Sequence, residues 1–302
     1  MDGFARATKI VEPHEAETTL AIDVANLSYR AYFSHQELTT KDGRPSGHVY
    51  GAVKLLIHHL KTVGGKVCIT YAYEGANATT RRRAMVPSYK MDRDPNRFDP
   101  KPDVEKLFRD IPGFHMTSVD CEGDDILAFI ATRSNKPVVI VSGDKDTWGL
   151  LQYPNVQIFS PNMDRFVTKE DVLEHFLVAD PSKVYLYKAV FGDTSDGVAG
   201  VYRLFKKQVA PVLNMEECKD IQSFYTLCKT APSVKPNSLA KISTELERLE
   251  KNLQVVTPHV EQAPDFSYTS TDPRNKEALL QNLKSWDCNL EELAIDIQLL
   301  FG

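Results

Sequence analysis

The chain has 302 residues, of which 42% are hydrophobic and 25% charged, and its formal net charge is −5. This length suffices for one large domain or a domain with an appendage, and the composition is that of a globular protein. No segment has the apolar length of a membrane span, and the first twenty residues lack the apolar core of a secretory signal. We therefore expect a cytoplasmic protein that has no membrane partner.

The cysteines and the net charge limit the function only loosely. Five cysteines are scattered along the chain, and none forms a Cys-x-x-Cys pair. This pattern argues against a disulfide framework or a zinc site and fits a reducing compartment. Proteins that bind nucleic acids are commonly basic, but acidic and basic residues are segregated along this chain, so its net charge does not exclude such a partner.

Apolar, strand-like runs alternate with segments of helical periodicity in the first part of the chain. The runs at residues 20–24, 67–73 and 138–142 predict strands. This alternation predicts an α/β fold with a central, mostly parallel sheet flanked by helices. The helical segments lie at residues 50–63, 104–110, 125–132 and 168–191.

Strand signals fade after residue 200, where the chain reads as helices interrupted by prolines. We predict an N-terminal arm over residues 1–19, an α/β domain over 20–190 and a helical domain over 191–302. Residues 79–101 form a long, basic, proline-containing connection between a strand and a helix. A charge run can be only a solvated face, but most connections of this kind are far shorter, which favours a functional role.

Acidic side chains follow several predicted strands or begin the next helix. Asp144 and Asp146 come directly after the strand at 138–142. One aspartate there is explained as a helix cap, whereas two so close together favour a hard divalent cation between them. The other candidates are Asp23, Glu74, Glu122, Asp124, Asp125, Asp193 and Asp196.

Each of these acids alone can be a helix cap, a partner of a helix dipole or a turn former. Together they indicate one site, because the carboxyl ends of parallel strands open on the same edge of a sheet. Nine uncompensated carboxylates in one cleft would repel one another strongly. Two or three Mg²⁺ or Mn²⁺ ions would relieve this repulsion, and a basic loop beside them points to phosphoryl chemistry.

The order of these motifs resembles the phage and bacterial 5′ nucleases, the 5′-3′ exonuclease and flap endonuclease family with a PIN-like core. Each motif is weak alone, but E-x-D-D, G-D-x-D and G-D-x-x-D in this order are specific. The matching segments are IDVANLSYRAYF at 22–33, RRRAMVPSYKMDRD at 81–94, CEGDDILAFIA at 121–131, VSGDKDTWGLL at 141–151 and YKAVFGDTSDGVAGV at 187–201.

The resemblance implies a PIN-like core, a helical arch at about 79–101 and a helix-three-turn-helix element that grips duplex DNA. It implies metal-ligand roles for all nine acids and a catalytic role for Asp146. Lys90 and Arg93 match the family's Y-K-x-x-R signature and are expected to contact the scissile phosphate as catalytic residues. The residues expected to contact DNA are Arg81, Lys90, Arg93, Gly197, Gly200, Arg203, Lys206 and Lys207.

The sequence departs from the family pattern in two places. Glu74 stands where the family usually has aspartate, with the same charge and a longer reach. After Asp196 the chain has fewer glycines than the family's DNA-binding hairpin, in which backbone amides approach the duplex. Arg203, Lys206 and Lys207 could supply phosphate contacts instead. The change leaves open whether a K⁺ ion binds there.

The resemblance implies a metal-dependent 5′-3′ exonuclease and structure-specific 5′ flap endonuclease, including the phage ribonuclease H type, that removes primers in replication. Its partners would be DNA with 5′ ends or flaps, RNA–DNA hybrids and a single-strand DNA-binding protein or replisome. The chain is expected to be a monomer in the cytoplasm, that of the host if a phage encodes it. Alternatives are a PIN-type ribonuclease and a non-catalytic DNA-binding relative. A haloacid-dehalogenase-type phosphatase is disfavoured, because its D-x-D motif would need an aspartate where Ala25 stands.

Overall fold

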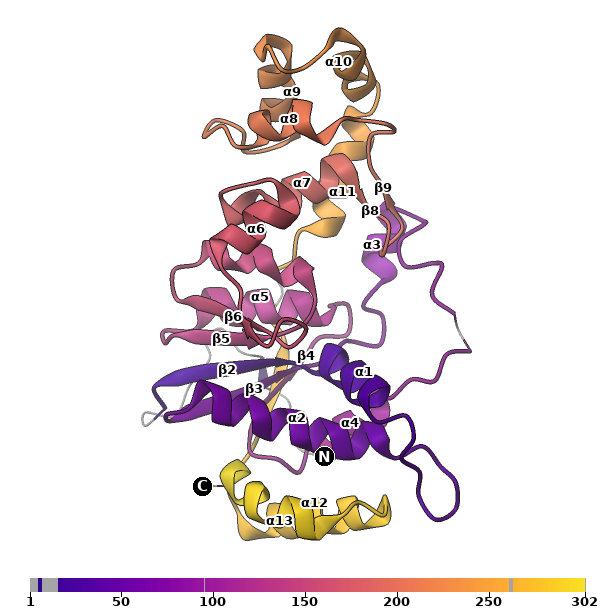
Figure 1. Ribbon diagram of the computed structural model, residues 1–302, viewed down its shortest axis with the longest axis vertical. Helices are drawn as coiled ribbons and strands as arrows, with labels where there is room; N and C mark the ends of the chain where they lie inside the picture. Colours follow the sequence, from indigo (N-terminus) through magenta and orange to yellow (C-terminus); the bar gives the residue numbers. More distant parts are fainter. Residues whose placement is uncertain (1–4, 7–15, 95, 261–262, 302) are drawn as a thin grey trace.

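An eight-stranded sheet crosses the middle of the molecule, with helices on both faces (Figure 1). This computed structural model describes residues 5–6, 16–94, 96–260 and 263–301. The strand order is β1-β10-β4-β3-β2-β5-β6-β7, and the five strands from β4 to β6 run parallel. The strands are β1 (Ala5–Arg6), β2 (Thr18–Asp23), β3 (Val67–Ala72), β4 (Gly113–Thr117), β5 (Val138–Val141), β6 (Val156–Ser160), β7 (Arg165–Phe166) and β10 (Asp265–Thr269).

The predicted α/β class with a mostly parallel sheet is confirmed. The strands predicted at 20–24, 67–73 and 138–142 are β2, β3 and β5, which are apolar and buried over most of their length. Such runs are typical of parallel strands that helices cover on both faces. The sequence analysis did not identify β4, β6, β7 or β10. Within the arm predicted over residues 1–19, β1 forms at Ala5–Arg6 and β2 begins at Thr18, while residues 1–4 and 7–15 lie outside the described residues.

One face of the sheet is covered by α1, α2 and α4, and the C-terminal helices α12 and α13 pack beneath them (Figure 1). Leu20, Ile22, Leu56, Phe108 and Leu283 belong to the buried cluster on this face. The elements are α1 (Val24–Ser34), α2 (Gly47–Val63), α4 (Lys101–Phe108), α12 (Pro273–Ser285), α13 (Leu290–Ile297) and the short 3₁₀ helix η3 (Gln298–Leu300).

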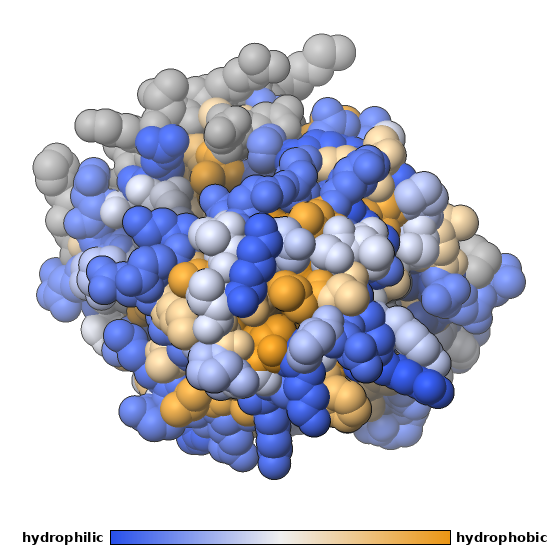
Figure 2. All heavy atoms as spheres, turned by 90° about the horizontal axis from the view of Figure 1, so that it is seen from above, coloured by the Kyte–Doolittle hydropathy of each residue, from blue (hydrophilic) through white to orange (hydrophobic). Residues whose placement is uncertain are grey.

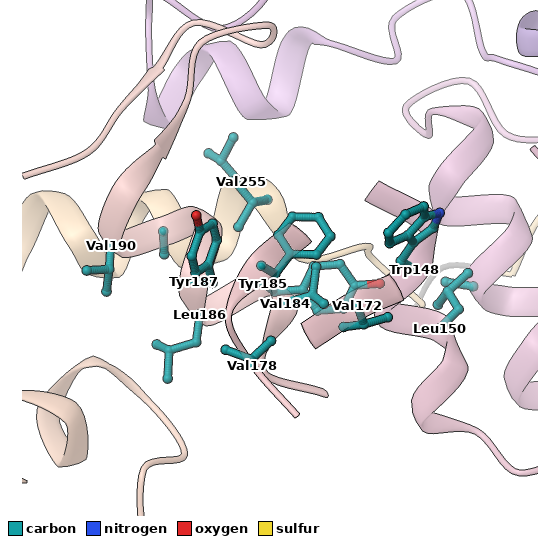
Figure 3. Packing of buried hydrophobic residues seen from close by; sticks show 14 of the residues in the cluster. Trp148, Leu150, Val172, Val178, Val184, Tyr185, Leu186, Tyr187, Val190 and Val255 are labelled. Atoms are coloured by element: carbon teal, nitrogen blue, oxygen red, sulfur yellow. The ribbon is translucent and has the colours of Figure 1, made fainter. Parts of the chain in front are cut away.

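The opposite face carries α5 and the 3₁₀ helix η1, followed by α6, α7 and α11. Figure 3 shows part of their shared core, including Trp148, Tyr185, Tyr187 and Val255. Helices α8, α9 and α10 lie beyond them at the far end (Figure 1). The elements are α5 (Gly123–Arg133), η1 (Lys145–Gln152), α6 (Lys169–Phe176), η2 (Pro181–Lys183), α7 (Val184–Phe191), α8 (Lys206–Leu213), α9 (Ile221–Thr230), α10 (Pro236–Ser243) and α11 (Leu246–Val256).

The chain after residue 191 is divided between opposite ends of the molecule. It begins with a small hairpin of β8 (Gly192–Asp193) and β9 (Val198–Ala199) and continues through α8–α11. It then returns to pair β10 with β4 and to pack α12 against α4. An all-helical reading of 191–302 therefore missed β10, because a five-residue strand far from its partner in sequence has little local signal. The domain boundary near residue 190 stays a prediction.

Two further segments differ from their predicted form. The helical segment expected over 168–191 consists of α6, η2 and α7, with a break after α6 where Leu177 adopts a left-handed backbone with φ of 58°. Among the described residues 79–94 and 96–100, only α3 (Thr80–Met85) is helical, and most of the others between α3 and α4 form turns and bends along the side of the molecule (Figure 1). None of the described helices has the length and apolar character to span a bilayer.

Candidate metal centre

The acidic groups gather at the carboxyl edge of the parallel strands, as their positions predicted. Asp23 ends β2, and its carboxylate accepts hydrogen bonds from the Asn26 amide (3.0 Å) and the Ser142 hydroxyl (2.8 Å). Glu74 follows β3, where Lys101 from the start of α4 contacts it at 2.5 Å. The helix-capping role of Asp23 and a position at the shared strand edge thus coexist.

Asp144 and Asp146 lie at the carboxyl end of β5. Asp144 begins η1 and accepts a hydrogen bond from the Asp146 amide at 2.9 Å. The preceding Gly143 amide donates to the Asn26 side chain at 2.8 Å, which joins this turn to α1. One acid of the pair is therefore a cap, and the second carboxylate is directed toward the β8–β9 hairpin, where it meets other acids.

Asp193 and Asp196 enter the site from the β8–β9 hairpin. Carboxylate oxygens of Asp146, Asp193 and Asp196 lie within 4.8 Å of one another. The buried ammonium group of Lys188 on α7 contacts Asp146 and lies 2.6 Å from Asp193. This triad has the all-oxygen donor set of a divalent-cation site, and Lys188 balances part of its charge.

Glu122 and Asp125 form a capping box at the start of α5, but their surroundings differ. Both oxygens of Asp125 accept hydrogen bonds from Arg82 at 2.8 Å, and one also accepts the His259 amide at 2.6 Å. Asp125 does not line the cavity that Asp23, Glu122 and Asp124 border. The structure thus brings eight of the nine predicted acids to the cavities and uses Asp125 to hold Arg82.

Arg82 contacts the acids of this site, whereas the expected contact of its neighbour Arg81 with DNA stays a prediction. Arg82 is 5% exposed and contacts Glu122, Asp125 and the Val255 carbonyl, whereas Arg81 is exposed. The contact joins α3 to both α5 and α11. Three consecutive arginines leave the sequence ambiguous, because only the rotation of α3 decides which of them faces inward.

Lys90 and Arg93 lie beside the acids, as expected. Lys90 contacts Glu122 at 2.5 Å and Asp196 at 3.7 Å, and Arg93 reaches Asp196 at 3.4 Å. Lys90 is nearly buried, whereas the Arg93 side chain is 59% exposed. Tyr89 is buried and donates to Glu122 at 2.6 Å, so it is a packing residue of this site.

Burial and mutual repulsion shift the protonation of the acids. Burial is the main cause that raises the pKa of Asp23 to about 6 and that of Asp146 to about 7, with Asp144 adding to the second shift. Burial opposes ionisation of Asp193 as well, but the Lys188 ammonium lowers the pKa of Asp193 below its ordinary value. The cluster therefore holds carboxylates whose charge is only partly compensated by the protein.

A charge count supports divalent cations. In the described part of the chain, five cationic side chains contact seven of the nine acids, which leaves an excess of four negative charges when all nine are ionised. Two divalent ions would balance that excess, and carboxylate oxygens are suitable ligands for them. The cations are Arg82, Lys90, Arg93, Lys101 and Lys188.

Two adjoining cavities expose these groups. The Asp23 cavity, about 190 Å³, is also bordered by Glu74, Glu122 and Asp124. The Asp193 cavity, about 590 Å³, is bordered by Asp193 and Asp196, and both cavities share Asp144 and Asp146. The shared pair thus connects the two halves of the acidic cluster.

The predicted DNA-contacting residues after Asp196 fall into two groups. A Cβ atom on Gly197 would lie 2.3 Å from the Ser88 carbonyl oxygen, and one on Gly200 2.1 Å from the Phe191 carbonyl carbon. These glycines therefore permit close packing within the protein. Lys206 and Lys207 are exposed at the start of α8, and Arg203 is exposed in the turn that precedes it. Seen from the α9–α10 end, the surface is mainly hydrophilic around a smaller hydrophobic area (Figure 2).

Sequence reasoning missed Lys188, although a signal was present. Lys188 is a single charge within the apolar helix VYLYKAVF, five residues before Asp193. A lone lysine on a buried helix requires an anionic partner. Arg82 and Lys101 carried no comparable signal, because each stands among other charged or polar residues.

The comparisons with known proteins agree with this geometry. Residues 18–177 match the family model of the 5′-3′ exonuclease N-terminal, resolvase-like domain. The chain belongs to this 5′-3′ exonuclease family. The motif-based resemblance is thereby confirmed.

Two relatives of known name show the same similarity over most of this chain. A 5′-3′ exonuclease of Aquifex aeolicus is 26% identical over 266 residues, which cover 80% of this chain and 88% of that protein. The thermostable DNA polymerase I of Thermus thermophilus is 30% identical over 243 residues, or 78% of this chain. The match spans only 28% of the polymerase's length.

Solved structures of nucleases share the fold. The T5 5′-exonuclease with zinc ions bound has a TM-score of 0.58 and 18% identity, over 94% of this chain and all of that chain. Flap endonuclease-1 of Methanococcus jannaschii has a TM-score of 0.57 and 14% identity, over 95% of this chain and 92% of that chain. At these identities the likeness concerns the fold, which is that of the 5′ nucleases.

Proposed function

We propose that this chain is a metal-dependent 5′-3′ exonuclease and structure-specific 5′ flap endonuclease that hydrolyses phosphodiester bonds. One observation carries the proposal: the carboxylate triad of Asp146, Asp193 and Asp196 adjoins Lys90 and Arg93. An acidic centre bordered by basic side chains suits an anionic substrate whose charge metal ions also balance. Family membership supports the same activity.

The ions are proposed to be Mg²⁺ or Mn²⁺, two or more of them. Asp144, Asp146, Asp193 and Asp196 would hold one part of the metal set, and Asp23, Glu74, Glu122 and Asp124 the other. When bound, such ions supply a strong oxygen nucleophile at neutral pH and counter-charge for the phosphate. Burial raises the pKa of Asp146 to about 7 in the metal-free protein, and a bound cation would favour its ionised form.

Lys90 and Arg93 are proposed to bind the scissile phosphate. Lys90 supplies a compact ammonium group, and the exposed guanidinium of Arg93 can clamp two phosphate oxygens. In the free protein both cations contact Asp196, at 3.7 and 3.4 Å. When substrate and metal ions bind, Lys90 and Arg93 would contact phosphate instead of Asp196. Asp196 would then contact a metal ion instead of the two side chains.

The substrate and setting belong to the proposal as well. We infer DNA with 5′ ends or flaps and RNA–DNA hybrids as substrates, primer removal as the task, and a monomer as the acting form. Arg203, Lys206 and Lys207 are proposed to contact backbone phosphates. The region 79–101 is proposed to guide the 5′ strand past Lys90. A single-strand DNA-binding protein or replisome is the proposed partner, in the cytoplasm.

Digestion of end-labelled substrates tests the function. The panel holds a 5′-flap duplex, a nicked duplex, an RNA–DNA hybrid and a single-stranded RNA, each incubated with Mg²⁺, Mn²⁺ or EDTA. We expect metal-dependent release of 5′ products from the flap and nicked duplexes. Cleavage of single-stranded RNA alone would support a PIN-type ribonuclease instead. Binding without cleavage in either metal would support a non-catalytic relative.

A further inference from the structure

The Asp193 cavity has walls of opposite charge. Asp144, Asp146, Asp193 and Asp196 border one part of this 590 Å³ space. Three basic side chains also line it: Lys145 and His175, which the function above leaves unused, and Lys206, which it assigns to a backbone phosphate. Within the described ranges, neither lysine forms an ion pair with a carboxylate; their contacts are with His175 and with aromatic rings.

Each of the three basic groups lies beside an aromatic ring. The Lys145 ammonium lies 5.7 Å from the Trp148 ring centre, and that of Lys206 lies 5.1 Å from the Tyr187 ring centre. The His175 ring meets Trp148 edge-on, with 5.7 Å between the ring centres. Trp148 and Tyr187 belong to one buried cluster (Figure 3). The three basic residues are exposed on the cavity wall, and these ring contacts favour the positions that they occupy there.

Toward a bound anion, the three groups present only hydrogen-bond donors. Lys145 Nζ lies 3.1 Å from His175 Nδ1. Because an ammonium group can only donate, Nδ1 is the acceptor and the neutral ring carries its proton on Nε2. Burial and the two lysines lower the pKa of His175, which favours this neutral form in the absence of an anion. A phosphate would meet two ammonium groups and one imidazole N–H.

We propose that Lys145, His175 and Lys206 form a second phosphate subsite, which binds a backbone phosphate of the substrate other than the one that is cut. The inference rests on the proposed nuclease function, since it takes the Asp193 cavity as part of the substrate path. A phosphate is the fitting ligand because it accepts from all three donors and is the repeating anion of a nucleic acid. The phosphate belongs either to the cut strand or to its complement, and the test separates the two.

The test measures binding in EDTA, so that no cleavage is needed. Fluorescence anisotropy gives the affinity of a 5′-flap duplex for the wild type, for the double variant Lys145→Gln/His175→Gln and for Lys169→Gln. Lys169 is exposed on the same helix as His175 and is the matched charge control. We expect the double variant to bind about tenfold more weakly and to lower the salt slope by about 1. Lys169→Gln should match the wild type, and an equal loss in this control would overturn the proposal.

Neutral methylphosphonate linkages, placed one at a time in each strand, locate the phosphate. We expect one linkage to weaken wild-type binding about tenfold and to leave binding of the double variant unchanged. The strand that carries this linkage identifies the source. If every linkage penalises both proteins equally, the subsite does not exist. Cleavage with Mg²⁺ or Mn²⁺ is assayed separately, so a wild type that binds but never cuts contradicts the nuclease function and leaves the subsite result readable.

Discussion

The Lys188 ammonium lies 2.6 Å from an Asp193 carboxylate oxygen and joins helix α7 to the β8–β9 hairpin. The same ammonium contacts Asp146 on η1. One buried lysine thus connects both sides of the candidate metal centre. Its charge substitutes for part of the cationic charge that the site requires, because buried carboxylates without a counter-charge are costly.

Replacing Lys188 with methionine should make the metal-free protein much less stable. Asp146 and Asp193 would lose their shared cation, which should lower the free energy of unfolding at pH 7.5 in EDTA by about 3 kcal/mol. Added Mn²⁺ should then raise the melting temperature of the variant more than that of the wild type. Thermal unfolding at increasing Mn²⁺ checks this, with Lys169→Met as the exposed control. An equal gain in both proteins would contradict the shared-charge argument.

Asp146→Asn should abolish most cleavage while it preserves binding. The amide is nearly isosteric but removes one anionic ligand from the triad, so we expect the single-turnover rate to fall by at least about a hundredfold. Affinity for a 5′-flap duplex in EDTA should stay within about threefold, because no contact to phosphate is lost. Asp164→Asn, at an exposed turn, serves as the control. Full activity in Asp146→Asn would disprove ligation by this residue.

Lys90→Ala should slow chemistry more than it weakens binding. Lys90 contacts Glu122 and Asp196 and is proposed to contact the scissile phosphate. Its positive charge would stabilise the transition state more than the bound substrate. We expect the single-turnover rate to fall about a hundredfold and the flap affinity less than about fivefold. Rapid-quench cleavage and anisotropy measure the two. If only affinity changed, Lys90 would be a docking residue.

The neighbouring arginines 81 and 82 offer a matched pair. Arg82→Gln should lower the free energy of unfolding by about 3 to 5 kcal/mol, because Glu122 and Asp125 would be left buried without their partner. Arg81→Gln should change it by less than about 0.5 kcal/mol, as an exposed substitution does. Urea unfolding in EDTA compares them. Similar losses of unfolding free energy in both variants would contradict the assignment of Arg82 as the buried arginine and Arg81 as the exposed one.

His59 should make the protein acid-sensitive. Burial lowers its pKa to about 4 from an ordinary value of 6.5, so between these values only the unfolded chain takes up the proton. Stability is therefore complete above pH 6.5 and falls toward pH 4, by up to about 1.4 kcal/mol per pH unit from this residue. His59→Leu should flatten the curve of unfolding free energy against pH in that window. Parallel curves for wild type and variant would exclude the effect.

The fold was predictable where its signal is local. The runs that became β2, β3 and β5 are continuous and apolar, and the segment 50–63 has clear helical periodicity within α2. Strand β10 was not predictable, because it pairs with β4 across more than 140 residues of chain. The five residues of β10 contain no local pattern that identifies β4 as the pairing strand.

The residues of the candidate site were also predictable only in part. Its acids were identified because carboxylates after parallel strands must meet at one edge of the sheet, and eight of nine line the cavities. The exception, Asp125, is turned inward by the helical spacing of α5, which places it against Arg82. The sequence could not separate Asp125 from Asp124, since the two differ only in their direction around the helix.

The sequence by itself determined the α/β class, the family and the gathering of acids, because hydrophobic period and motif order are properties of neighbouring residues. The tertiary structure decided which cation meets which acid: Lys188 between Asp146 and Asp193, and Arg82 instead of Arg81 at Glu122. These contacts depend on the rotation of α3 and α7 against the sheet. That rotation is set by packing over the whole chain and has no counterpart in a local pattern.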